Sequence, residues 1–133
     1  MINLYIFSNK SRGGLYGVGT YIRELITALR SKSNSIHIHV VHILCDQLQI
    51  EKKEVKDVSY WYFPEPISKE WNLLDQEQRK VYSRNIVYLL RNYIQDQKNL
   101  VFHLNSYRDK SLALELKIAF DCKVITVTHF SEW

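Results

Sequence analysis

Apolar stretches and helical patterns alternate along most of this chain. Continuous apolar or β-branched runs, bounded by polar residues, occupy residues 2–7, 36–44 and 58–63. Two further runs of this kind occupy 99–106 and 122–130. Short runs of this composition are typical of strands that are buried in a sheet, so the pattern predicts a strand at each of these places.

Between these runs, apolar side chains recur at intervals of three and four residues, which places them on one face of a helix. The first such pattern begins near residues 19–20 and ends at the polar stretch RSKSNS, 30–35. The second extends over residues 72–97 and the third covers 109–120. The polar stretch CDQLQIEKKEVKD, 45–57, has neither period, and we expect a loop with a short element there.

The order of the predicted elements determines the expected fold class. Strands that mostly alternate with helices indicate a parallel sheet covered on both faces. We therefore predict an α/β fold, namely a Rossmann-like, doubly wound, mostly parallel sheet with helices on both faces and the first strand at its centre. The 133 residues suffice for one domain with a real core but hardly for two, so residues 1–133 are expected to form a single domain.

All four glycines of the chain lie in the segment GGLYGVG, 13–19, between the first strand and the first helix. Glycine permits a positive φ and lets a ligand approach the backbone without a Cβ in the way. The helix after the segment presents unpaired N–H groups and a partial positive charge, an arrangement that suits phosphate. The segment lacks the GK[ST] of a P-loop and the third glycine of the dinucleotide fingerprint. A flexible turn is the alternative interpretation.

The excess positive charge lies at the same place. The chain has a net charge of +4, and residues 1–32 carry a single acid, Glu24, whereas the remainder of the chain is neutral. This distribution favours an anionic ligand near the glycines over a general nucleic-acid surface, and we expect no nucleic-acid partner. The basic residues of the segment are Lys10 and Arg12, which flank the glycines, and Arg23, Arg30 and Lys32, which also fit an exposed helix face.

Polar side chains come directly after several of the predicted strands. In an open parallel sheet, ligands bind outside the carboxyl ends of the strands, near the point where the strand order reverses. The residues expected at these ends are Ser8 and Asn9 after the first strand, Asn105, Ser106 and Tyr107 after the fourth, and Thr128, His129, Phe130 and Ser131 after the fifth. A binding crevice is therefore predicted where these ends meet.

The histidines differ in their expected roles. His129 comes after the buried run VITVT, so its side chain should face a ligand, although a structural role is the alternative from position alone. His103 is expected to be a core residue. His37 and His39 alternate on one strand face, with His42 on the other. An HxH pair can hold a metal, but no nearby cysteine or carboxylate completes a set, so we predict no metal site.

The N-terminus and the cysteines bear on the cellular location. The run 36–44 is far too short to span a bilayer, and the first residues carry neither a basic leader nor a small-residue cleavage site. Cys45 and Cys122 lie far apart and are expected to be free thiols in a reducing compartment. These features favour a cytoplasmic protein.

Three motifs occur in order along the chain: GGLYGVGTYIRELITAL (13–29), LVFHLNS (100–106) and KVITVTHFSEW (123–133). Together they resemble the N-terminal domain of GT-B glycosyltransferases, specifically the family-4-like group. In that family a GGxGxY loop and helix come after the first strand, a DvvHxH strand lies mid-domain, and a vvxTvHd strand comes later. The resemblance extends from Ile2 to Trp133.

The resemblance implies roles for the glycine segment. Gly17 would place its amide near the diphosphate of a nucleotide-sugar donor. Gly14 and Gly19 would shape the turn, and Arg12 would add positive charge beside the diphosphate. Tyr16 stands where the family has a glycine, which leaves open which glycine pair is the equivalent one.

The resemblance also implies roles at the later strand ends. His129 matches the histidine that contacts the reacting sugar, whereas Phe130 replaces the acid that commonly comes after it. Asn105 stands where the family has the second histidine of HxH. With Asn105, the residues expected to line the acceptor side of the cleft are Asn9, Ser106 and Ser131.

The activity implied by the resemblance is that of a retaining glycosyltransferase. Such an enzyme transfers a sugar from a nucleotide-sugar to a sugar, lipid-linked or protein acceptor, with no cofactor and no bound metal. Two Rossmann-like domains face each other across the cleft, and the second holds most of the donor. This chain would supply the acceptor-side lobe, apparently truncated and without the donor-binding domain, so we expect no turnover by the chain alone.

Two other functions fit the same residues. A non-catalytic Rossmann-like protein-interaction module would use the sheet edge and the tyrosine-rich strand, and a phosphate-binding domain of another α/β enzyme would use the glycines. An open sheet edge also offers a route to homo-oligomers, and peripheral contact with a membrane surface is compatible with a lipid-linked acceptor. The sequence leaves the donor sugar, its nucleotide and the acceptor open.

Overall fold

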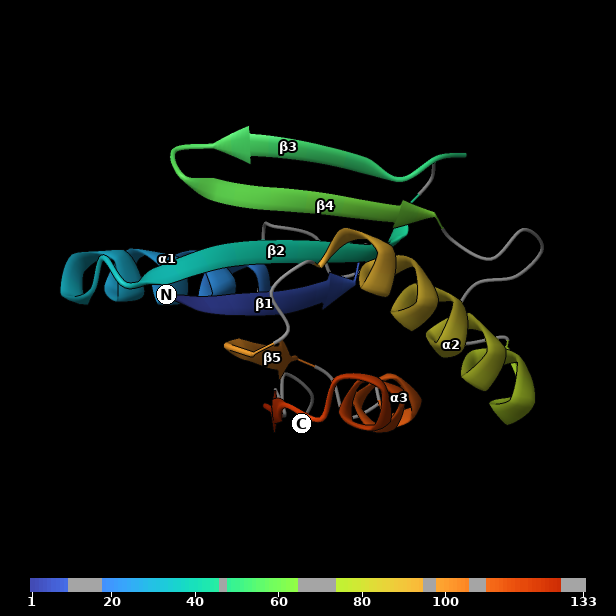
Figure 1. Ribbon diagram of the computed structural model, residues 1–133. Coiled ribbons are helices and arrows are strands. Elements are labelled where there is room, and N and C mark those ends of the chain that lie inside the picture. The colour runs from blue at the N-terminus through green and yellow to red at the C-terminus, as the bar shows by residue number, and fades with distance from the viewer. Residues whose placement is uncertain (10–17, 46–47, 65–73, 95–97, 106–109, 128–133) are drawn as a thin grey trace, which may run out of the picture.

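The computed structural model shows a sheet with helices on both of its faces (Figure 1). The described residues are 1–9, 18–45, 48–64, 74–94, 98–105 and 110–127. The first helix lies behind the sheet in Figure 1, and the other two lie in front of it. No helix within these ranges is long and apolar enough to cross a lipid bilayer.

The six strands of this sheet are, in chain order, β1 (Ile2–Asn9), β2 (Ile36–Cys45), β3 (Glu51–Val55), β4 (Val58–Pro64), β5 (Leu100–Leu104) and β6 (Lys123–Thr126). Their spatial order is β3-β4-β2-β1-β5-β6. Neighbouring strands are parallel, except that β3 and β4 form an antiparallel hairpin at one edge. The doubly wound, mostly parallel α/β sheet predicted from the sequence is thereby confirmed, with β1 inside the sheet as expected.

The helices are α1 (Val18–Lys32), α2 (Gln76–Tyr93) and α3 (Lys110–Phe120). α2 begins with a capping box, in which Asp75 accepts a hydrogen bond from the backbone N–H of Gln78 and the Gln78 side chain accepts one from the Asp75 N–H. This reciprocal pair satisfies two N–H groups that the helix start would otherwise leave unpaired. The helix therefore begins four residues later than the apolar pattern alone suggested.

Successive strand residues pack alternately into two apolar cores, one on each face of the sheet. On one face, Tyr5 and Phe7 of β1 belong to a cluster that includes α2 and α3. On the other face, Leu4 and Ile6 of the same strand pack in a cluster with Ile22 of α1. Because successive strand residues point to opposite faces, β1 contributes side chains to both cores. This is why the residues of the run 2–7 are apolar without alternation.

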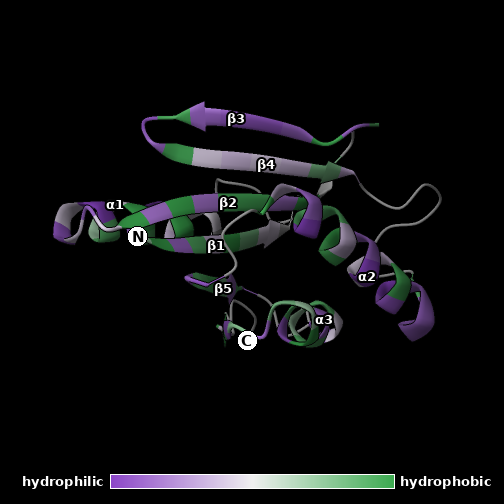
Figure 2. Cartoon of the chain, viewed as in Figure 1, coloured by the Kyte–Doolittle hydropathy of each residue, from purple (hydrophilic) through white to green (hydrophobic). Residues whose placement is uncertain are grey.

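The short element expected within 45–57 is β3, an edge strand whose five residues are all exposed. The sequence pattern did not indicate that this element is a strand. An edge strand exposed on both faces needs no apolar period, and Figure 2 shows β3 as mostly hydrophilic. The hairpin turns through Lys56 and Asp57, whose φ values of 49° and 67° are left-handed.

Candidate functional site

The strand order locates the crevice. β1 has β2 on one side and β5 on the other, and the helix after β1 covers the opposite face from the helix that precedes β5. The chain therefore winds away from β1 in two directions, and the order reverses between β1 and β5. In open α/β sheets, ligands bind outside the carboxyl ends of the strands at this switch point. The first candidate site is thus the region beyond β1 and β5.

Asn105 lies at this point, directly after β5. Its side-chain Nδ2 donates a hydrogen bond of 2.9 Å to the backbone carbonyl of Phe7 in β1. Only 5% of the Asn105 surface is exposed. Asn105, predicted as a cleft residue, therefore lies at the switch point, and at least part of its hydrogen-bonding capacity is used to join the two central strands.

The start of α1 borders the same region. Gly19, predicted to shape the diphosphate turn, is the second residue of α1. The first turn of α1 contains no acidic residue, so no carboxylate of that turn neutralises the positive end of the helix dipole. The ring of Tyr21 in this part of α1 lies 5.9 Å from the ring of His103 in β5, centroid to centroid. His103 is buried, which confirms its predicted place in the core.

The remaining predicted site residues are placed only in part. Asn9 is the last residue of β1 and pairs with Ile43 of β2, which places its backbone at the carboxyl edge of the sheet. The other predicted residues, which lie outside the described ranges, are Arg12, Gly14, Gly17, Ser106, His129 and Ser131.

A second polar cluster lies on the face of the sheet that carries α2 and α3, away from the carboxyl edge. Trp61 donates its Nε1–H to Nδ1 of His39 at 3.2 Å. Because an indole nitrogen can only donate, His39 must carry its own proton on Nε2, which then donates to Oδ1 of Asn3 at 3.3 Å. Burial, together with the charges of His37 and Lys52, lowers the pKa of His39 to about 3. His39 is therefore a neutral structural residue.

His37 belongs to the same cluster but makes different contacts. Ser59 donates its hydroxyl proton to Oε1 of Glu54 at 2.7 Å, so its oxygen accepts from Nε2 of His37 at 3.1 Å. The Ser59 hydrogen bond holds the pKa of Glu54 below its usual value. Since both nitrogens of His39 are engaged, the HxH pair offers no second metal donor. Within the described residues, no three His, Cys, Asp or Glu side chains are grouped to hold an ion.

His42 points to the opposite face, as the alternation predicted. Its ring stacks on Tyr62, with centroids 5.0 Å apart and planes within 15°, and lies nearly parallel to Tyr60. Burial lowers the pKa of His42 and raises that of Tyr62, so both rings stay uncharged near neutral pH. The ammonium of Lys53 lies over the Tyr62 ring, 5.6 Å from the ring centroid. These contacts form a cross-strand aromatic ladder that stabilises the β2–β4 pair.

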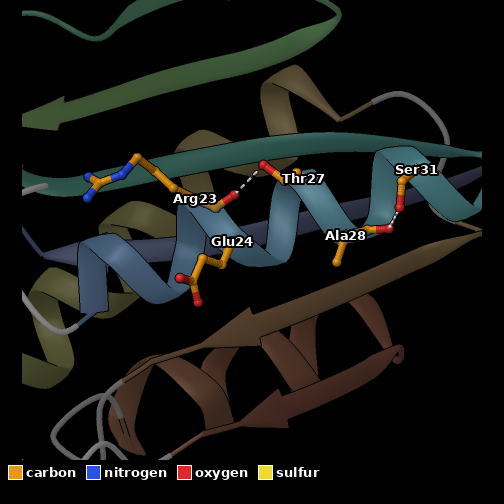
Figure 3. A pocket seen from close by; sticks show the side chains of 5 residues that line it. All are labelled: Arg23, Glu24, Thr27, Ala28 and Ser31. Carbon is orange, nitrogen blue, oxygen red and sulfur yellow. Dashed lines mark hydrogen bonds between the residues drawn. The ribbon is translucent and has the colours of Figure 1, made fainter.

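An open groove of about 320 Å³ runs along the exposed side of α1 (Figure 3). It is lined by Arg23, Glu24, Thr27, Ala28 and Ser31. The hydroxyl of Thr27 donates to the carbonyl of Arg23 at 3.0 Å, and that of Ser31 donates to the carbonyl of Ala28 at 2.8 Å. The hydroxyl protons are thus used within the helix, and the groove is a weaker candidate than the crevice beyond β1 and β5.

Comparison with known proteins gives one solved structure that bears on this fold. No protein-family model and no curated protein sequence matches the chain. The structure described as "OtsA apo structure" superposes with a TM-score of 0.61 at 11% sequence identity. The match covers 97% of this chain but only 33% of the OtsA chain, so the chain spans about a third of that protein. At this identity the likeness shows the fold alone, a Rossmann-like α/β sheet.

Proposed function

We propose that this chain is the N-terminal, acceptor-side lobe of a retaining glycosyltransferase that uses a nucleotide-sugar donor. The observation that carries the proposal is the switch point between β1 and β5, where the glycine segment leaves β1 and leads into α1. The structural neighbour OtsA is itself a glycosyltransferase. The sequence motifs suggest this class of enzyme, and the fold is compatible with it.

The first step in the proposed mechanism is recognition of the donor diphosphate by the glycine segment. Gly14, Gly17 and Gly19 let the backbone approach the phosphates, and the positive end of α1 and Arg12 supply charge. During transfer, negative charge develops on the departing nucleoside diphosphate. Backbone amides and a guanidinium aimed at that charge lower the barrier, and no bound metal or cofactor is required.

The second step concerns the acceptor. His129 comes after β6 and is proposed to contact the reacting sugar, where an imidazole can hold or move a proton near neutral pH. Asn9, Asn105, Ser106 and Ser131 form the acceptor side of the cleft in this proposal. The acceptor is a sugar, a lipid-linked or a protein group, and a second Rossmann-like domain supplies most of the donor contacts. We place the enzyme in the cytoplasm.

The proposal is tested with the protein in which this chain is joined to its donor-binding domain. The assay measures release of nucleoside diphosphate from UDP-, GDP- and ADP-sugars in the presence of mixed acceptors. We expect one donor to be consumed, and we expect His129→Leu to abolish most of that turnover. The control is His37→Leu, which replaces a histidine of the polar cluster that lies away from the carboxyl edge of the sheet.

Two results would count against the proposal. Binding of simple nucleotides without consumption of any sugar nucleotide favours a phosphate-binding domain of another enzyme. Full activity of the His129→Leu variant would show that His129 takes no part in the reaction.

A further inference from the structure

Exposed apolar side chains gather on the outer side of α2 and α3. The two helices lie next to each other in front of the sheet (Figure 1), and their buried residues belong to the core on that face. In α2, Val81 is 54% exposed and Tyr88 is 69% exposed. In α3, Leu114 is 57% exposed and Ile118 is 69% exposed. Single apolar residues are ordinary on a surface, but a group on one face is typical of a site that binds another molecule.

An ion pair between the two helices lies among these side chains. Arg84 of α2 donates its Nε–H to Oε1 of Glu115 of α3 at 3.2 Å. Arg84 is three residues after Val81 and four before Tyr88, which places the three side chains on one stripe of α2. Glu115 lies one helical turn before Ile118 in α3. The ion pair therefore brings the apolar stripes of the two helices together. We call this surface the α2–α3 outer face; its residues are Val81, Arg84, Tyr88, Leu114 and Ile118.

The guanidinium of Arg84 has hydrogen-bonding capacity left over. The Arg84 side chain is 58% exposed, and its bond to Glu115 uses only Nε. Among the described residues, the two Nη groups of Arg84 have no further hydrogen-bond partner. Glu115 thus holds the guanidinium in place while the forked edge with both Nη groups stays open. That edge has the geometry that binds a carboxylate through two parallel hydrogen bonds.

α2 and α3 are basic as a pair, although residues 33–133 as a whole are neutral. They carry six basic side chains and two acidic ones, namely Arg79, Lys80, Arg84, Arg91, Lys110 and Lys117 against Glu77 and Glu115. A second copy of this chain would bring the same positive charge to the interface, and like charges across an interface disfavour association. The charge of the α2–α3 outer face is therefore complementary to an acidic partner.

We propose that the α2–α3 outer face binds an acidic amphipathic helix of a partner protein. The apolar side of that helix packs on Tyr88 and Ile118, and one of its carboxylates accepts hydrogen bonds from both Nη groups of Arg84. Tyrosine and arginine at the centre of an interface are the residues that commonly contribute most to binding. The inference is independent of the proposed function, since none of these residues is assigned to the crevice beyond β1 and β5.

The position of Arg84 favours a protein partner over a membrane surface. Helices that lie on a membrane keep their charged residues on the polar side, away from the apolar residues that enter the lipid. Arg84 lies instead between Val81 and Tyr88 on one stripe, so lipid chains that cover these two residues would also cover the guanidinium. A partner helix can place a carboxylate at this point.

The test uses a synthetic peptide of about five helical turns, with leucine along one side and glutamate on either side of the leucines. Its binding to the 133-residue chain is followed in ¹H–¹⁵N spectra at low salt. We expect a micromolar dissociation constant and shifts in the signals of α2 and α3 but not of α1. A matched peptide with glutamine in place of glutamate should bind about tenfold more weakly, because it cannot form the charge-assisted bonds to Arg84.

Two variants test the surface from the side of the protein. Arg84→Gln removes the guanidinium and Tyr88→Ala removes the aromatic ring, and each should weaken binding of the glutamate peptide about tenfold. The matched control is Arg30→Gln, which replaces an exposed arginine in the last turn of α1, on the opposite face of the sheet. It should leave the affinity unchanged. Because all three side chains are exposed, the melting temperatures should stay close to that of the unaltered chain.

Several results would overturn the proposal. It is wrong if the unaltered chain does not bind the glutamate peptide, or if the glutamine peptide binds equally well. It is also wrong if Arg84→Gln or Tyr88→Ala retains full affinity, or if Arg30→Gln weakens binding as much as they do. Vesicles of phosphatidylcholine and phosphatidylglycerol provide the last arm of the test. If Tyr88→Ala impairs binding to these vesicles while the peptide does not bind at all, the surface is a membrane contact and not a protein interface.

Discussion

The free energy of unfolding should fall less steeply with decreasing pH when His39 is replaced by glutamine. His39 is 5% exposed, and its pKa is lowered to about 3, mainly because burial disfavours the imidazolium. The unfolded chain binds the proton near the ordinary pKa of 6.5, so below that pH the unfolded state takes up a proton that the folded state refuses. The neutral His39 side chain therefore makes its full contribution to the free energy of unfolding above pH 6.5, and this contribution is lost as the pH falls toward 3.

The magnitude is set by the two pKa values. Each pH unit between them changes the free energy of unfolding by about 1.4 kcal/mol, so the loss between pH 7 and pH 5 is about 2 kcal/mol. His39→Gln retains an acceptor for Trp61 and a donor for Asn3, which are the partners of the two imidazole nitrogens. The side chain no longer titrates, and this part of the pH dependence should disappear.

The assay is urea unfolding of the unaltered chain and of His39→Gln at a series of pH values from about 7.5 to 5. At each pH the difference between their free energies of unfolding is compared. Val41→Ala is the control, since Val41 is buried in the same strand and its truncation lowers stability equally at every pH. If His39→Gln shows the same decline toward pH 5 as the unaltered chain, His39 is not the group responsible.

Three further substitutions test individual parts of the fold by urea or thermal unfolding. Ser83 is 1% exposed and its hydroxyl has no hydrogen-bond partner among the described residues, so Ser83→Ala should raise stability by about 1 kcal/mol; a loss would show that the hydroxyl is satisfied. Asp57 has a φ of 67°, and Asp57→Gly should stabilise the hairpin by up to about 1 kcal/mol, whereas a loss would mean that the carboxylate contributes more than the backbone strain. Leu116 is 0% exposed, and Leu116→Ala should cost about 2–5 kcal/mol, with a cost below about 1 kcal/mol excluding its place in the core.

Most of the fold was predictable because buried strands and helices place apolar residues in recognisable patterns along the sequence. The run 36–44 reads as a strand, since its apolar side chains fill both cores, and α1 shows its apolar stripe at helical spacing. β3 shows no such pattern, because an edge strand exposed on both faces is stabilised by its ladder to β4 rather than by apolar contacts. Helix ends were misjudged where a cap, such as Asp75 with Gln78, begins the helix inside an apolar pattern.

The candidate site was predictable only at the level of strand ends. Asn105 was expected in the cleft, but its bond to Phe7 joins residues far apart in the sequence, and no spacing along the chain indicates it. The tautomer of His39 likewise depends on Trp61 and Asn3, which come from two other strands. Contacts between strands of distant sequence position depend on topology, and only the structure supplies them.

The central claim is that the crevice beyond β1 and β5 is half of a glycosyltransferase site. Its most direct test is sugar transfer by the proposed two-domain protein carrying Gly17→Leu, compared with Ala28→Leu, which adds a bulky side chain to the groove along α1. We predict that Gly17→Leu loses at least about tenfold in transfer rate, because a side chain would occupy the space of the diphosphate, and that Ala28→Leu retains the unaltered rate. Full transfer by Gly17→Leu, or an equal loss in Ala28→Leu, would contradict the account.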